Sequence, residues 1–96
     1  MVAEFTEPAA IELDDAFEYY ELQLQGLGKI FLNEIIETLN LISQFPQLFA
    51  PISEHTRKAV MCKFPYNLIY SIRQNKISIL AIAHQNRMPE YWIDRV

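Results

Sequence analysis

The sequence predicts an α+β fold in which an N-terminal helical hairpin packs on a small antiparallel sheet, in the order β-α-α-β-β-β. Residues 6–45 carry apolar side chains at the three- and four-residue spacing of amphipathic helices. Residues 57–84 instead carry short apolar runs separated by turn residues, as strands do. Because helices and strands occupy separate parts of the chain, we expect the hairpin to cover one face of a single sheet.

A short strand at residues 2–5 opens the chain, and Thr6 is expected to cap the helix that follows. Glu7 and Pro8 suit the first turn of this helix, because a carboxylate is favoured at its positive end and proline needs no intrahelical donor there. The apolar stripe of the helix consists of Leu13, Ala16, Phe17, Tyr20 and Leu24. The acids between these positions are expected to face water. A glycine-containing turn at residues 26–28 ends the helix.

A second helix follows this turn and continues to Phe45 and Pro46, where proline stops it. Its apolar stripe consists of Phe31, Ile35, Leu39 and Ile42. Two helices joined by so short a turn pack as an antiparallel hairpin. Residues 47–55 include Pro51 and Ser53 and are expected to form a connecting loop.

Three strands are predicted in the second half of the chain, at residues 57–64, 67–73 and 76–84. The turns between them are short, so the strands should form an antiparallel meander, and the N-terminal strand should join its edge. The last strand is almost wholly apolar from Ile77 to Ala83. Such a run is typical of a central strand that is covered on both faces.

The length and composition of the chain fit one domain over residues 1–96, with 51% hydrophobic residues to fill a single core. The single cysteine, Cys62, excludes an internal disulfide and a cysteine metal cage. His55 and His84 are too far apart in sequence for metal-ligand spacing, so we expect neither a metal nor a cofactor. The first residues lack the basic and apolar regions of a secretory signal, which predicts a cytoplasmic protein with no membrane association.

The net charge of −4 is divided unequally between the two halves of the chain. Residues 1–48 contain nine acidic side chains and one lysine, whereas residues 49–96 contain seven basic and three acidic side chains. The helical half is therefore expected to present an acidic surface, and the sheet half a basic one.

Polar and aromatic side chains follow the last predicted strand, where residues 84–95 read H-Q-N-R-M-P-E-Y-W-I-D-R. Further motifs are Phe17-Glu18-Tyr19-Tyr20 in the first helix, Phe45-Pro46 after the second, Arg57 ahead of Phe64-Pro65-Tyr66, and Ile69-Tyr70. In this order, over nearly the whole length, the motifs resemble the ParE/RelE superfamily, the toxins of bacterial type II toxin–antitoxin modules. The pattern H-x-x-R-x-P followed by Y-W-x-x-R is typical of its ParE-like branch.

The ParE-like resemblance implies the RelE/ParE-like form of the α+β fold and a protein that inhibits DNA gyrase by binding, without a catalytic centre. It also implies neutralisation by a cognate antitoxin, growth arrest in the absence of that antitoxin, plasmid stabilization, and no direct DNA binding by the toxin alone. The residues expected to bind the target are Arg57, His84, Arg87, Tyr91 and Trp92. Arginine and aromatic side chains dominate interface energetics.

The RelE-like branch implies a different activity, ribosome-dependent cleavage of mRNA. On that alternative the catalytic residues are Lys58, Arg87 and Tyr91. RNA cleavage needs several convergent cations or proton donors, yet Val60 and Asn67 stand where the branch would supply further cations. The sequence therefore favours gyrase inhibition over mRNA cleavage. A third alternative, favoured by the acidic composition, is a degenerate, non-toxic relative that acts only as an interaction protein.

Several candidate residues also have structural interpretations. Arg87 has Glu90 and Asp94 nearby in sequence as ion-pair partners. Trp92 either anchors a partner or folds back over the sheet. The lone His84 is favoured as a hydrogen-bonded part of the scaffold. Alternation along the strand favours core packing for two further aromatic residues, Tyr66 and Tyr70.

Overall fold

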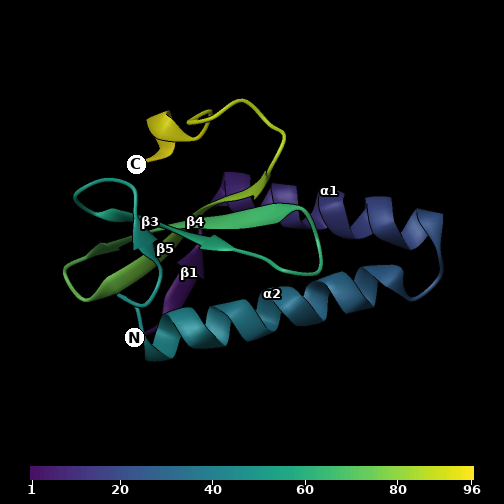
Figure 1. Cartoon of the computed structure of the whole chain (residues 1–96), viewed down its shortest axis with the longest axis horizontal. Helices are drawn as coiled ribbons and strands as arrows, with labels where there is room; N and C mark the ends of the chain where they lie inside the picture. Colours follow the sequence, from purple (N-terminus) through teal and green to yellow (C-terminus); the bar gives the residue numbers. More distant parts are fainter.

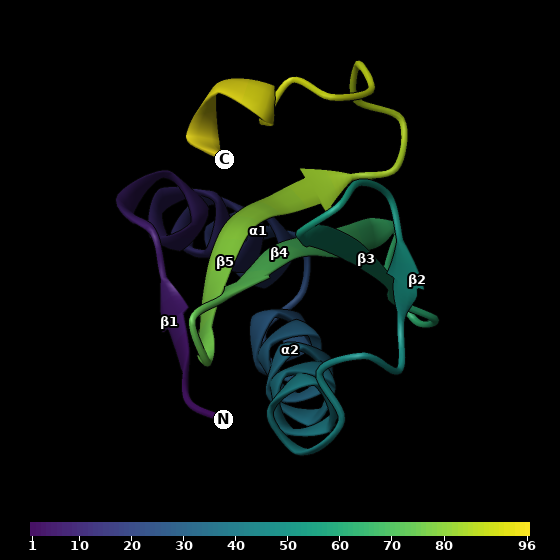
Figure 2. The same cartoon turned by 90° about the vertical axis from the view of Figure 1, so that its left-hand side faces the viewer.

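The computed structural model describes residues 1–96 and has two helices on one face of a five-stranded sheet (Figures 1 and 2). The elements are β1 (Ala3–Phe5), α1 (Glu7–Gln23), α2 (Leu27–Gln44), β2 (Ala50–Pro51), β3 (Thr56–Val60), β4 (Tyr66–Arg73), β5 (Lys76–His84) and a final 3₁₀ turn, η1 (Ile93–Arg95). The predicted α+β fold is confirmed, with β2 as an additional strand. Neither helix is long and apolar enough to cross a membrane.

The sheet has the strand order β1-β5-β4-β3-β2. Strands β3 to β5 form the expected antiparallel meander, β2 extends it beyond β3, and β1 joins the edge beside β5. However, β1 runs parallel to β5, with Ala3 opposite Ile77 and Phe5 opposite Ile79, so the sheet is mixed rather than wholly antiparallel. A parallel pair needs a long crossover connection rather than a hairpin. The helical hairpin and the meander together provide it.

Two boundaries in the middle of the chain differ from the prediction. The expected loop at residues 47–55 contains the short strand β2, which pairs with β3. The strand expected to continue to Phe64 ends at Val60. After it, the backbone N–H groups of Cys62 and Lys63 donate to the carboxylate of Glu34 on α2, at 2.9 and 3.1 Å. Because Glu34 lies on α2, this contact joins the helical layer to the chain just after β3. The Glu34 side chain is buried there.

A bulge in β5 lets this strand serve two apolar clusters. Ile69 lies opposite Ala81, but Tyr70 lies opposite Ile79, so Leu80 is an extra residue in β5. Ile79 and Ile82 consequently both belong to the cluster under the helices, whereas Leu80 and Ala81 belong to a second cluster under the C-terminal segment. The prediction that this strand is covered on both faces is confirmed.

The main core lies between the helices and the sheet. It includes Tyr20 on α1, Phe31, Ile35 and Ile42 on α2, and Leu68, Tyr70, Ile77, Ile79 and Ile82 on the sheet. The predicted stripes are confirmed except at two positions of the first helix. Phe17 is half-buried and lies outside the core cluster, beside Gly28, and Leu24 is exposed just past the end of α1. Thr6 precedes α1 but makes no capping hydrogen bond; its hydroxyl donates to the carbonyl of Ile79 at 2.9 Å instead.

The turn of the helical hairpin depends on Gly28. The carboxylate of Glu21 accepts hydrogen bonds from the N–H groups of Gly26 and Gly28, which fixes the start of α2 beside the end of α1. A Cβ atom on Gly28 would lie 2.9 Å from the carbonyl oxygen of Phe17 and 3.0 Å from its ring. The two helices therefore approach too closely here for any side chain.

We expect Gly28→Ala to lower the free energy of unfolding by about 1–3 kcal/mol, because overpacking forces the backbones apart. Urea unfolding followed by circular dichroism measures the change. Asn33→Ala, at an exposed position of the same helix, serves as the control and should leave stability nearly unchanged. In an open helical site glycine-to-alanine substitution stabilises by up to about 1 kcal/mol, so a more stable Gly28→Ala protein would contradict the close approach.

Candidate functional site

The C-terminal segment, residues 85–96, crosses the outer face of the sheet, opposite the helices (Figure 2). Trp92 holds it there. The indole is 7% exposed and packs against Ile69, Leu80, Ala81 and Ala83. Of the two alternatives for Trp92, the structure thus shows the one in which the ring folds back over the sheet. It supports the surface from beneath and presents no free ring in this conformation.

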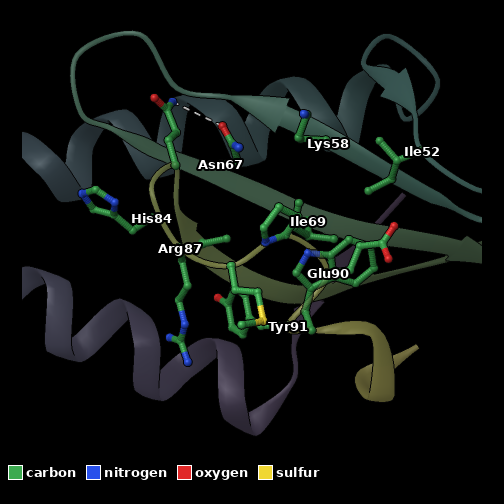
Figure 3. Close-up of a pocket in the computed structure, with 13 residues that line it drawn as sticks. Ile52, Lys58, Asn67, Ile69, His84, Arg87, Glu90 and Tyr91 are labelled. Atoms are coloured by element: carbon green, nitrogen blue, oxygen red, sulfur yellow. Dashed lines mark hydrogen bonds between the residues drawn. The ribbon is translucent and has the colours of Figure 1, made fainter.

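A cavity of about 290 Å³ lies between the C-terminal segment and strands β3 to β5 (Figure 3). Its apolar lining includes Ile69, Ala83 and Trp92, and its polar lining includes Lys58, His84 and Arg87. Tyr91 also lines it, so all three residues of the nuclease alternative reach one cavity. However, Figure 3 shows the Arg87 side chain directed away from Lys58, toward α1.

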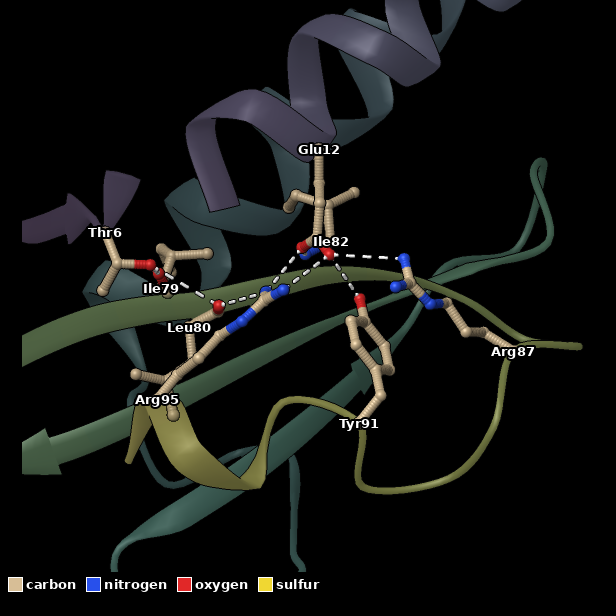
Figure 4. A network of polar contacts seen from close by, with 8 residues as sticks. All are labelled: Thr6, Glu12, Ile79, Leu80, Ile82, Arg87, Tyr91 and Arg95. Carbon is tan, nitrogen blue, oxygen red and sulfur yellow. Dashed lines mark hydrogen bonds and ion pairs between the residues drawn. The ribbon is translucent and has the colours of Figure 1, made fainter. Parts of the chain in front are cut away.

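The carboxylate of Glu12 on α1 joins this segment to the helical layer (Figure 4). Its Oε1 atom accepts hydrogen bonds from the backbone N–H of Ile82 at 3.0 Å and from Arg95 Nη1 at 2.9 Å. Its Oε2 atom accepts from Tyr91 Oη at 2.7 Å and from Arg95 Nη2 at 3.1 Å. Only 14% of the Glu12 side chain is exposed. The hydrogen bonds of this largely buried carboxylate therefore come from strand β5 and from the C-terminal segment together.

Arg87 lies at the exposed margin of this network. Its guanidinium carbon is 3.9 Å from the centroid of the Tyr91 ring, and its Nη1 atom is 3.7 Å from Glu12 Oε2. The acidic partner of Arg87 is therefore Glu12, not Glu90 or Asp94. Since 55% of the side chain is exposed, the guanidinium remains open to a partner while it rests on an aromatic face.

The Tyr91 phenol is kept protonated by its surroundings. Its pKa rises from 10.0 to about 12, first because of burial and then because of its hydrogen bond to Glu12 and the negative charge there. The positive charges of Arg87 and Arg95 oppose this shift but do not cancel it. The phenol is thus a hydrogen-bond donor at neutral pH.

This shift predicts a loss of stability at alkaline pH. The folded protein keeps the Tyr91 proton up to a pKa of about 12, whereas the unfolded chain releases it near 10.0. The stabilisation is therefore complete below pH 10 and declines as the pH rises from 10 toward 12. We expect the free energy of unfolding to fall more steeply over this range for the wild type than for Tyr91→Phe, as measured by urea unfolding. Parallel curves would contradict the assignment.

Two further predicted residues have structural partners. His84 ends β5; its ring packs edge-on against Tyr66 at 5.1 Å between centroids, and its Nδ1 atom accepts from the N–H of Asn86 at 3.0 Å. Arg57 on β3 donates to the carbonyls of Phe49 at 2.6 Å and Gln47 at 3.1 Å. It thereby holds the chain before β2. Arg57 does not line the cavity and takes no part in the Glu12 network. The other four predicted residues, His84, Arg87, Tyr91 and Trp92, all line the cavity.

Sequence analysis missed Glu12 and Arg95 as parts of the site. The acids of the first helix were expected to face water, and Glu12 does not. A signal was present, because Glu12 follows Ala9 by three residues and precedes Ala16 by four, and both alanines are buried. Glu12 therefore stands on the face of α1 that meets the sheet.

The comparisons with known proteins agree with this architecture. A family model described as the ParE toxin of the type II toxin-antitoxin system, parDE, matches residues 3–89. Toxin ParE2 from two strains of Mycobacterium tuberculosis, CDC 1551 / Oshkosh and ATCC 25618 / H37Rv, is 30% identical over 82 residues, covering 81% of this chain and 75% of the relative. A solved structure described as the chromosomal ParDE TA system from P. aeruginosa shares the fold, with a TM-score of 0.76 and 19% identity over 88% of this chain and 95% of the other. The chain belongs to the ParE family of type II toxin–antitoxin toxins.

Proposed function

We propose that this ParE-family toxin inhibits DNA gyrase by binding and that a cognate antitoxin neutralises it. Gyrase as the target, growth arrest and plasmid stabilization follow from the ParE-like resemblance of residues 84–95. The observation that most directly supports a binding role is the exposed guanidinium of Arg87, stacked on Tyr91. Arginine and tyrosine are enriched among the few residues that dominate interface energies. A rigid ring beneath the arginine also lowers the entropy cost of binding.

Binding is favoured over RNA cleavage by the chemistry of the cavity. A ribonuclease needs cations and proton donors that converge on one phosphate. The Arg87 guanidinium is directed toward Glu12, away from Lys58. The Tyr91 phenol, with a pKa of about 12, is a weak proton donor to a leaving oxygen at neutral pH. Asn67, which also lines the cavity, supplies no charge.

The antitoxin is proposed to dock beside α1, where β5 extends beyond β1. Two adjoining hollows lie there, and both are lined by Tyr19, Tyr66 and His84. Asp15 and Arg87 line the second hollow. A segment with apolar and basic side chains would complement aromatic walls beside the acidic helix. Because Arg87 lines the same hollow, such a segment would cover the residue proposed to contact gyrase, which gives neutralisation a steric basis.

The test is a supercoiling assay with purified gyrase, relaxed plasmid and the purified chain. We expect inhibition by the chain alone, and recovery when the antitoxin encoded beside it is added in equal amount. Without gyrase, the mobility of the plasmid should not change, because we propose no direct contact between the toxin and DNA. The net charge of −4 is consistent with that.

Inducible expression in a bacterium without the antitoxin provides the second arm. We expect growth to stop and plasmid supercoiling to be lost. Arrest with normal supercoiling and A-site cuts in translated mRNA would instead support the RelE-like alternative. Normal growth at high expression would support the non-toxic interaction protein.

A further inference from the structure

We propose that Glu12, on the first helix, is a positioning residue that docks the C-terminal segment and sets the Arg87–Tyr91 pair for its target. That Glu12 docks the C-terminal segment does not depend on the identity of the target. That the Arg87–Tyr91 pair contacts gyrase rests on the proposed function. Tyr91 and Arg95, the residues through which Glu12 acts, lie beyond the residues matched by the family model, which end at Pro89.

The carboxylate of Glu12 is itself held in a fixed orientation. Its Oε1 atom accepts from the N–H of Ile82, a group of β5 that lies past the end of β1 and just after the bulge. Because Ile82 belongs to the sheet, this hydrogen bond keeps the Glu12 carboxylate in place even when a surface loop moves. Glu12 therefore offers its remaining acceptor positions in a constant direction, toward Tyr91 and Arg95.

Few other polar contacts hold the segment in place. Apart from the turn bond between Arg87 N and His84 O, every hydrogen bond that joins residues 87–96 to the rest of the chain ends on Glu12 or on the carbonyl of Leu80. The Leu80 bond comes from Arg95, whose guanidinium Glu12 also orients. Gln85, at the start of the segment, is held separately by hydrogen bonds to Pro65, Tyr66 and Asn67. Beyond it, residues 87–96 have one apolar anchor, Trp92, and one polar anchor, Glu12.

The position of Arg87 depends on this polar anchor. The Tyr91 hydroxyl fixes the direction of its ring by donating to Glu12 at 2.7 Å, and the Arg87 guanidinium rests 3.9 Å above that ring. Glu12→Gln removes the counter-charge for Arg87 and leaves a single side-chain oxygen to accept from Ile82, Tyr91 and Arg95, which the two carboxylate oxygens now share. The ring is then free to turn, and the guanidinium loses its support. Glu12 lies on α1, so the helical layer determines the geometry of a segment whose Trp92 packs on the opposite face of the sheet.

The single tryptophan of the chain makes the docking measurable, since Trp92 lies in the C-terminal segment and is buried. In Glu12→Gln we expect a red-shifted Trp92 emission and greater quenching by acrylamide, while far-ultraviolet circular dichroism stays native. The concentration that halves gyrase supercoiling should rise at least tenfold, which corresponds to about 1.4 kcal/mol. Glu18→Gln makes the same chemical change at an exposed position of the same helix and should alter neither measurement.

A second variant keeps the test decisive if Glu12→Gln folds poorly. Tyr91→Phe retains the ring and the bond between Glu12 and Ile82, but removes the hydroxyl that orients the ring. We expect it to weaken inhibition as well. In the double variant the two effects should not add, because both substitutions break one shared contact.

Unchanged emission and quenching in a folded Glu12→Gln protein would overturn the proposal, as would fully additive effects in the double variant. The result is separable from the identity of the target. If the wild-type chain leaves gyrase active, the proposed target is wrong, and the Trp92 signal together with growth arrest still decides the role of Glu12.

Discussion

Replacing Trp92 by alanine is expected to lower the free energy of unfolding by about 3–5 kcal/mol, the usual cost of removing a buried large aromatic side chain. The indole is 7% exposed and covers the outer cluster, which contains Ile69, Leu80, Ala81 and Ala83. Without the indole, β5 is no longer covered on its outer face, and the C-terminal segment loses its apolar anchor. Because total stability is of the order of 5–15 kcal/mol for a protein domain, this loss is a large part of the whole.

The measurement is urea unfolding followed by circular dichroism, since the variant has no tryptophan to report by fluorescence. Ile93→Ala is the matched control, because Ile93 is the next residue and is 52% exposed. We expect it to change stability by less than about 0.5 kcal/mol. A Trp92→Ala protein as stable as this control would show that the outer cluster contributes little to the free energy of unfolding. It would then favour the alternative in which Trp92 anchors a partner.

Arg87→Ala is expected to have the largest effect on function. An arginine at the centre of an interface costs about 2 kcal/mol or more when it is truncated, so the concentration that halves gyrase supercoiling should rise at least about 30-fold. Growth arrest on induction should weaken in parallel. Stability should hardly change, because the side chain is 55% exposed and its ion pair with Glu12 is long, at 3.7 Å.

The control for this prediction is Arg73→Ala. Arg73 is exposed at the turn between β4 and β5, at the opposite end of these strands from Arg87. It removes the same charge, so a general electrostatic effect would appear in both variants. Equal inhibition by the wild type and Arg87→Ala would contradict the proposed contact surface, whatever the result for Arg73→Ala.

The sequence was sufficient to predict the hairpin and the meander because both are local. Stripes such as Phe31, Ile35 and Ile42 repeat within one helix, and short connections make the consecutive strands β3, β4 and β5 pair with one another. The parallel direction of β1 could not be predicted this way, because it pairs residues more than 70 positions apart. β2 was missed because two residues, one of them proline, carry no periodic pattern.

Only some members of the candidate site could be predicted from the sequence, and none of the contacts between them. The C-terminal motif identified Arg87 and Tyr91, which the structure places in contact. Their link to Glu12 spans 75 and 79 residues, and no local pattern encodes a contact of that separation. Arg57 was predicted as an anchor because it is an arginine near a motif; in the structure its Nη1 atom donates to two backbone carbonyls, away from the other predicted residues. Chemical type indicates what a side chain is able to bind, whereas the tertiary fold decides what it does bind.

The parallel pairing of β1 with β5 also has a consequence during protein synthesis. The first strand, β1, cannot pair until β5 has been synthesised near the end of the chain. Glu12 cannot bind Tyr91 and Arg95 until still later. Until then the hairpin exposes the apolar face that the sheet will later cover. The surface proposed to reach gyrase is therefore the last part to be assembled. A nascent chain that has not yet received its last residues would carry the helices without the proposed target surface.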